Sequence, residues 1–91
     1  MTGRITMHCH VSGRVQGVWF RGGAREQARA LGIDGYARNL PDGRVDVLAR
    51  GTPEAVAALL DWLRQGPPNA EVAELQHEQV DVIPDKGFRI L

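Results

Sequence analysis

The sequence predicts an α+β fold, in which one face of an antiparallel β-sheet is covered by two α-helices. Two segments, 4–12 and 44–50, alternate between apolar and polar side chains, which is the period of a half-buried strand. Two further segments carry apolar residues at helical spacing, and glycine and proline signals separate all of these segments. The order strand, helix, strand, strand, helix, strand can therefore be followed along the chain.

Residues 4–12 form the first predicted strand. Its expected core-facing side chains are Ile5, Met7, Cys9 and Val11, and its expected outward-facing side chains are Thr6, His8 and His10. Residues 22–31 have alanines and a leucine at helical spacing and predict a helix. Gly32 stands where a glycine commonly ends a helix.

Residues 34–40 and 44–50 predict a β-hairpin. Pro41-Asp42-Gly43 between them is a strong turn signal, because proline presets φ and glycine accepts a left-handed conformation. In the second strand of the hairpin, the expected core-facing residues are Val45, Val47 and Ala49, and the expected outward-facing residues are Asp46, Leu48 and Arg50.

A second helix is predicted after Thr52, which is a good N-cap and is followed by proline and glutamate. Its apolar stripe consists of Val56, Leu59, Leu60 and Leu63. Gly66-Pro67-Pro68 ends it, residues 74–82 predict a further strand, and residues 88–91 could add a short terminal one. This order describes a ferredoxin-like split βαβ sandwich, βαββαβ, a fold that hosts enzymes, RNA-binding domains and regulatory domains alike.

The composition indicates a single domain spanning residues 1–91. A chain of this length with 43% hydrophobic residues can build one core but not two. Eleven basic and eleven acidic residues give a net charge of zero, so no charge excess attracts nucleic acid or an anionic membrane. Cys9 is the only cysteine, and neither a signal peptide nor a membrane-spanning run is recognised. We therefore expect a cytoplasmic monomer.

Residues 13–21 have the outline of an anion-binding loop. Gly13 and Gly17 allow positive φ, so that successive backbone N–H groups can point into one concavity. Arg21 stands at the start of a helix, where the dipole disfavours a cation by about 0.3–1 kcal/mol. A bound anion would remove this conflict, because guanidinium, amides and helix N-terminus would all point at it. The alternative is a simple turn with a solvated arginine.

Residues 13–21, GRVQGVWFR, resemble the signature of the acylphosphatases, small enzymes that hydrolyse the carboxyl–phosphate bond of acyl phosphates. Residues 35–45, GYARNLPDGRV, resemble a second motif of that family. The similarity continues through Gly66-Pro67-Pro68, Ala70-Glu71-Val72 and Gly87-Phe88-Arg89-Ile90. The resemblance is specific because it runs nearly end to end and in the order of the family.

The resemblance implies an acylphosphatase whose substrate is a small acyl phosphate and whose mechanism needs no metal. We expect no cofactor, and the composition already argues against nucleic acid or a membrane as a partner. Arg21 would bind the phosphate, while a backbone cradle would consist of Val15, Gln16, Gly17, Val18, Trp19 and Phe20. Asn39 would hold the attacking water, a role that only the resemblance assigns, because asparagine before a turn usually bonds its own backbone. Phosphate oxygens of the substrate would take the proton from the water, without a phosphoenzyme.

One position departs from the family pattern. The residue after the arginine usually carries a larger side chain in the family, whereas Gly22 and Gly23 follow Arg21 here. Glycine lowers helix propensity, so we expect a looser helix start and a less preorganised loop.

Other functions are compatible with the predicted fold. An RNA-recognition domain shares the topology, but the two central strands carry no outward-facing aromatic side chains on which bases could stack. A non-catalytic domain that binds phosphate or another small anion, or an inactive relative of the enzymes, would have the same loop. The acylphosphatase-like segment of a larger maturation factor is a further alternative, which we do not expect.

A metal site is not expected either. His8 and His10 share the outward face of the first strand, but a metal ion would need a third ligand. The only other imidazole, His77, is distant in the sequence, so we expect these histidines to be solvated.

Overall fold

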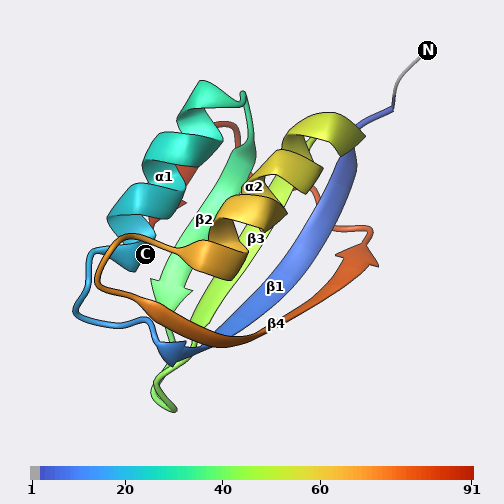
Figure 1. Cartoon of the computed structure of the whole chain (residues 1–91). Helices are drawn as coiled ribbons and strands as arrows, with labels where there is room; N and C mark the ends of the chain where they lie inside the picture. Colours follow the sequence, from blue (N-terminus) through green and yellow to red (C-terminus); the bar gives the residue numbers. More distant parts are fainter. Residues whose placement is uncertain (1–2) are drawn as a thin grey trace.

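The structure, a computed structural model, describes residues 3–91. Its elements are β1 (Ile5–Arg14), α1 (Phe20–Ala30), β2 (Asp34–Asn39), β3 (Val45–Gly51), α2 (Pro53–Gln65), β4 (Glu71–Val80) and β5 (Phe88–Ile90). The first six elements follow the predicted order βαββαβ, and β5 is the short terminal strand (Figure 1).

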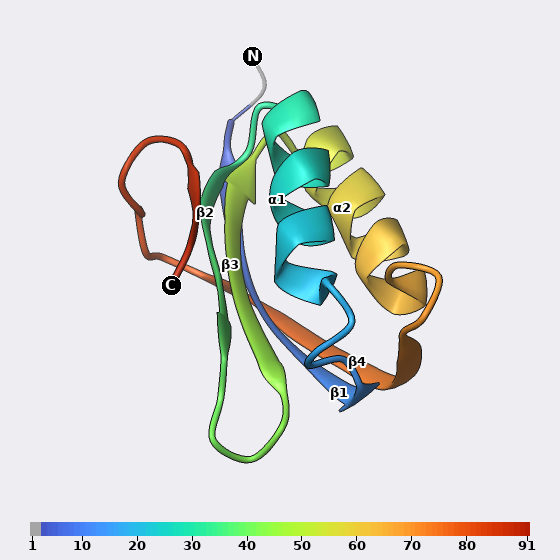
Figure 2. The same cartoon turned by 90° about the vertical axis from the view of Figure 1, so that its left-hand side faces the viewer.

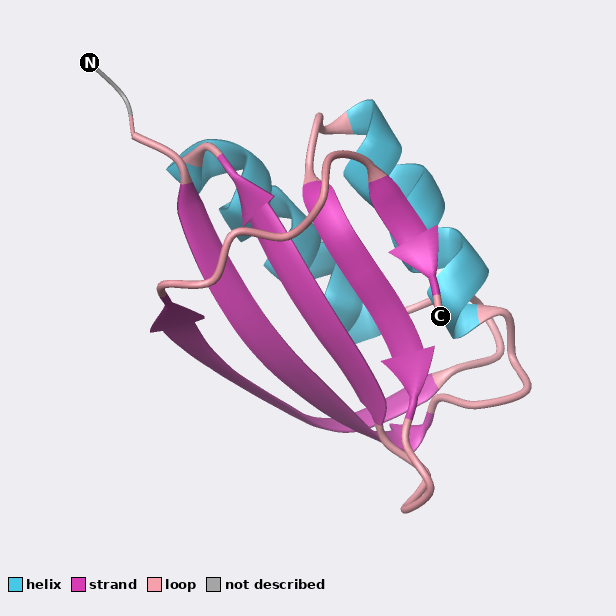
Figure 3. Ribbon diagram, turned by 180° about the vertical axis from the view of Figure 1, so that it is seen from behind, coloured by secondary structure: helices cyan, strands magenta, loops and turns pink. Residues whose placement is uncertain are grey.

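The strands form one sheet in the order β4-β1-β3-β2-β5. Both helices pack on the same face of this sheet, which gives two layers (Figure 2). The predicted α+β, ferredoxin-like class is therefore confirmed. Neighbouring strands are antiparallel except β2 and β5, which are parallel, so β5 makes the sheet mixed at that edge. The opposite face carries no helix, and the segment between β4 and β5 crosses it (Figure 3).

The core lies between the helices and the sheet. Side chains that are at most 1% exposed include Cys9 and Val11 from β1, Val47 from β3, Ala24 from α1 and Leu59 from α2. This confirms the expected inward faces of the two central strands and the stripe of the second helix. Burial raises the pKa of the Cys9 thiol to about 12, so Cys9 stays protonated and is a core residue, not a nucleophile.

Two strands extend by two or more residues beyond their predicted bounds. β1 continues through Gly13 to Arg14, and a bulge between Ser12 and Gly13 brings Gly13 against β4. A Cβ at Gly13 would lie 2.2 Å from the carbonyl oxygen of Glu71, so only glycine allows this close approach. β4 accordingly begins at Glu71, three residues before the prediction, because backbone pairing with β1 sets its start. Its side-chain pattern could not show this, since β4 is an edge strand.

The second helix ends as its sequence predicts. The Thr52 hydroxyl accepts a hydrogen bond from the N–H of Ala55 at 3.2 Å, Pro53 begins the helix, and Gly66 follows it with φ 71°. Neither this helix nor any other within residues 3–91 is long and apolar enough to span a membrane.

Candidate active site

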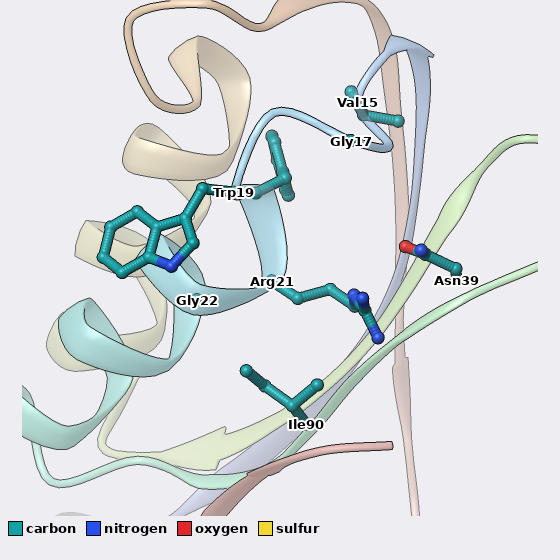
Figure 4. A pocket seen from close by; sticks show the side chains of 8 residues that line it. Val15, Gly17, Trp19, Arg21, Gly22, Asn39 and Ile90 are labelled. Carbon is teal, nitrogen blue, oxygen red and sulfur yellow. The ribbon is translucent and has the colours of Figure 1, made fainter.

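A pocket of about 270 Å³ lies where the β1–α1 loop, the start of α1, the end of β2 and strand β5 meet. Its lining residues are Val15, Gly17, Trp19, Phe20, Arg21, Gly22, Asn39 and Ile90. Figure 4 shows Arg21 and Asn39 extending toward each other across it, whereas the Trp19 side chain points away. The structure therefore brings together the predicted arginine, asparagine and glycine loop, which are up to 24 residues apart in the sequence.

The loop before α1 has the backbone geometry of an anion cradle. Gly17 has φ 76° and Trp19 has φ 64°. For a residue other than glycine, such as Trp19, this left-handed conformation costs about 1–2 kcal/mol. Within residues 3–91, the N–H groups of residues 15–21 donate no hydrogen bond to a backbone or side-chain acceptor. Backbone N–H groups in folded proteins are normally hydrogen-bonded to protein, water or a ligand. These donors, which have no partner among the described residues, are therefore available to a ligand.

The N-terminus of α1 is open, in contrast to that of α2. Its N-cap residue, Trp19, offers no side-chain acceptor, and its first turn contains no acidic residue. α2 has both, in Thr52 and Glu54. α1 begins at Phe20, two residues before the prediction, so Arg21 lies within its first turn. Unpaired N–H groups and the helix dipole there favour an anion.

The Arg21 side chain is held at the pocket by the end of the chain. Its Nη1 donates to the main-chain oxygen of Leu91 at 3.2 Å. A guanidinium has five N–H donors, so the contact leaves others for a ligand. The sequence did not reveal the contributions of Leu91 and Ile90, because β5 reaches the pocket through its parallel pairing with β2. The family-like Gly87-Phe88-Arg89-Ile90 was the only signal that these residues matter.

Asn39 is the last residue of β2 and lies opposite Val45 in the hairpin. Its side chain is exposed and points toward the loop and Arg21 (Figure 4). Among the described residues, its carboxamide makes no hydrogen bond to its own backbone or to another side chain. Its donor and acceptor groups are thus both open to the pocket, unlike those of an asparagine that only shapes a turn.

Gln16 connects the cradle loop to the β2–β3 hairpin. Its Nε2 donates to the carbonyl oxygens of Leu40, at 2.9 Å, and Arg44, at 3.0 Å. Leu40 directly follows Asn39, so this side chain joins the loop to the segment that carries Asn39. The sequence predicted a backbone role for Gln16 but not this side-chain contact.

Gly22 and Gly23 are buried under two indole rings. A Cβ at Gly22 would lie 2.4 Å from Nε1 of Trp19, and one at Gly23 would lie 2.7 Å from Cη2 of Trp62. The rings occupy the space that larger side chains would need. This packing gives a reason for glycine at both positions, and the looser helix start expected from glycine propensity stays a prediction. The two aromatic residues of the loop differ in exposure: the Trp19 side chain is 59% exposed, whereas the Phe20 side chain is buried.

A larger, basic cavity of about 460 Å³ includes the start of β2 and the segment before β5. Its arginines already have partners. Arg4 contacts Asp34 and donates to Gly32, Arg29 donates to Phe88, and Arg89 contacts Asp85. The pocket at Arg21 differs from it, because the loop there carries backbone amides that have no partner within residues 3–91.

The fold and the pocket define a small α+β protein in which an arginine, an asparagine and a glycine-containing loop line one pocket. The acylphosphatase family profile matches residues 7–90. An acylphosphatase of Alkalilimnicola ehrlichii is 53% identical over 81 residues, covering 89% of this chain and 91% of that protein. One of Halorhodospira halophila is 60% identical over 73 residues, covering 80% and 79%. An acylphosphatase structure from Coxiella burnetii has a TM-score of 0.93 at 36% identity, covering 97% and 93%.

The chain therefore belongs to the acylphosphatase family, and the predicted family and hydrolase class are confirmed. The roles of individual residues, the monomeric state and the cytoplasmic location stay predictions.

Proposed function

We propose that the pocket binds the phosphate group of a small acyl phosphate, and that Arg21 and Asn39 are the catalytic residues for hydrolysis of its carboxyl–phosphate bond. The observation that supports this most strongly is the set of N–H groups in residues 15–21, which have no partner within residues 3–91 and belong to a loop that lines the same pocket as both side chains. A tetrahedral phosphate has enough oxygens to accept from several of these amides and from the guanidinium together.

Hydrolysis proceeds by direct attack of water on phosphorus. The Asn39 carboxamide binds the water and places it opposite the bond to the acyl oxygen. As the new O–P bond forms, the bond to the acyl oxygen breaks and the carboxylate leaves with the electron pair. Arg21 and the loop amides stabilise the charge on the transferring phosphoryl group.

No protein base is needed in this reaction. Among the residues that line the pocket, Arg21 is the only one with an ionisable side chain, and arginine remains protonated in proteins. The proton of the attacking water therefore passes to a phosphate oxygen of the substrate. The carboxylate is a good leaving group and requires no proton. Positioning and charge stabilisation then account for catalysis.

The proposal is tested by phosphate release from acetyl phosphate. We expect turnover that is undiminished by EDTA and nearly constant from about pH 5 to 8, because neither arginine nor asparagine titrates in that range. A pH profile with a steep limb near the ordinary histidine pKa would contradict the assigned residues. Phosphate binding without turnover would instead indicate a non-catalytic anion-binding protein.

Replacing Gln16 by leucine is expected to lower kcat by between about 10-fold and 100-fold, because the cradle then loses its connection to the Asn39 segment. Loss of both hydrogen bonds should also cost about 1–3 kcal/mol of unfolding free energy. Steady-state kinetics and urea unfolding measure the two effects. Gln27→Leu, at an exposed position of α1, is the matched control. A kcat equal in both variants would show that Gln16 does not position the site.

A further inference from the structure

The helix-free face of the sheet carries a second group of converging side chains, the His8–His10–Asp46 cluster. His10 lies directly opposite Asp46 across β1 and β3, and His8 is two residues away on the same face of β1. The Asp46 Oδ1 lies 2.5 Å from Nε2 of His8 and 3.3 Å from Nε2 of His10. Asp46 is only 1% exposed, whereas both imidazoles are partly exposed. Two imidazoles and a buried carboxylate thus meet at one point.

We propose that this cluster binds a divalent transition-metal ion of the Zn²⁺ class. Two imidazole nitrogens and one carboxylate oxygen form a ligand set that such ions prefer. The three ligand atoms lie within 4.8 Å of one another. Ligands of one tetrahedral Zn²⁺ ion stand about 3.3 Å apart, given metal–ligand distances near 2.0–2.1 Å. The His10–Asp46 pair already has this spacing. The shorter His8–Asp46 contact is a hydrogen bond, which the ion would replace.

The missing third ligand was Asp46, not His77. The register pairs His77 with Cys9, whose side chain lies in the core between sheet and helices. His77 lines the cavity beside the cluster, but its ring is not among the three ligand groups that converge, which are His8, His10 and Asp46. Asp46 was expected on the outward face of its strand, as were the histidines, but only the observed β1–β3 register shows that it stands beside His10.

The surroundings of Asp46 suit a metal ligand. The Arg38 Nε donates to Oδ2 of Asp46 at 2.7 Å, which fixes the carboxylate and leaves Oδ1 toward the histidines. An outer hydrogen bond of this kind commonly orients a ligating carboxylate. The Arg38 side chain is 50% exposed, so solvent reduces, without removing, its repulsion of a cation.

A fourth ligand position is available beside β4. Glu78 lies opposite His8, and Gln76 lies opposite His10. Together with His8, His10 and His77 they line a cavity of about 240 Å³, which adjoins the cluster and could supply the fourth ligand as a water molecule or as the Glu78 carboxylate. None of the residues lining this cavity lines the pocket at Arg21. The metal site is therefore separate from the phosphate site, and its ion would link β1 to β3.

The proposal is tested by isothermal titration of Zn²⁺ into the tag-free full chain, with His8→Gln, His10→Gln and His77→Gln as variants. We expect one ion per chain, an affinity at least about tenfold weaker in each of the first two variants, and wild-type affinity in His77→Gln. Asp46→Asn is avoided as the main test, because a buried, paired aspartate can be needed for folding. The two tested histidines are partly exposed and their variants should fold.

Imidazole ¹⁵N resonances provide the second readout. Zn²⁺ should shift the ring nitrogens of His8 and His10 and leave those of His77 in place. Absence of binding, equal binding in His8→Gln, or loss only in His77→Gln would overturn the proposal. Hydrolysis is not a readout here, so the metal site can fail while the proposed phosphate chemistry stands, and the reverse.

Discussion

Replacing Arg21 by glutamine is expected to lower kcat/KM for acyl phosphate hydrolysis by about 10³-fold or more. Removal of one neutral donor to a developing charge typically costs about 10²–10³-fold, and Arg21 supplies a charged, forked donor. The expected loss appears in phosphate affinity as well, because the guanidinium binds the group in both ground and transition states. Steady-state kinetics with inorganic phosphate as a competitive inhibitor measures both quantities.

Two further variants separate charge from geometry at this position. Arg21→Lys keeps the charge but cannot form two parallel hydrogen bonds, so most of the loss should remain. Arg25→Gln removes a positive charge one turn further along α1, outside the residues that line the pocket, and should retain wild-type kinetics. If Arg21→Gln and Arg25→Gln have the same modest effect, Arg21 contributes only general electrostatics and is not catalytic.

Replacing Asn39 by alanine is expected to lower kcat by about 10²–10³-fold with little change in phosphate affinity. The carboxamide acts on the water, whereas the loop and Arg21 hold the phosphate, so binding and turnover should separate. Stability should change little, because the Asn39 side chain makes no hydrogen bond within residues 3–91. Kinetics, phosphate inhibition and urea unfolding are the three measurements.

Asn69→Ala is the matched control for Asn39, since it removes an exposed carboxamide from the loop before β4. A parallel fall in phosphate affinity and kcat in Asn39→Ala would assign Asn39 to phosphate binding. Unchanged kcat would remove Asn39 from the mechanism altogether.

Local chemistry explains why much of the fold could be predicted. The cap at Thr52, the apolar stripe of α2 and the alternation in β1 and β3 are signals contained within short segments. The parallel β2–β5 pairing and the start of β4 depend on strands far apart in the chain. A three-residue strand with one buried residue carries too little pattern to show its partner.

The loop with Arg21, the Asn39 side chain and the Trp19 conformation could be predicted from the sequence to different degrees. Glycine spacing and a cation at a helix start pointed to the loop and Arg21 from the residues alone. Asn39 required the family resemblance, because an asparagine before a turn has a simpler role available. The positive φ of Trp19 could not be predicted, since side chains other than glycine rarely adopt it. That conformation places the indole over Gly22 and so explains the glycine that departs from the family pattern.

Titration of ¹⁵N-labelled protein with inorganic phosphate tests most directly whether the loop amides and Arg21 form the phosphate site. We expect the largest amide shifts in residues 15–21, together with shifts of the Asn39 carboxamide and the Arg21 guanidinium. The same titration of Arg21→Gln should require a far higher phosphate concentration. Shifts centred instead on the basic cavity around Arg4, Arg29 and Lys86, with residues 15–21 unaffected, would contradict the proposed site.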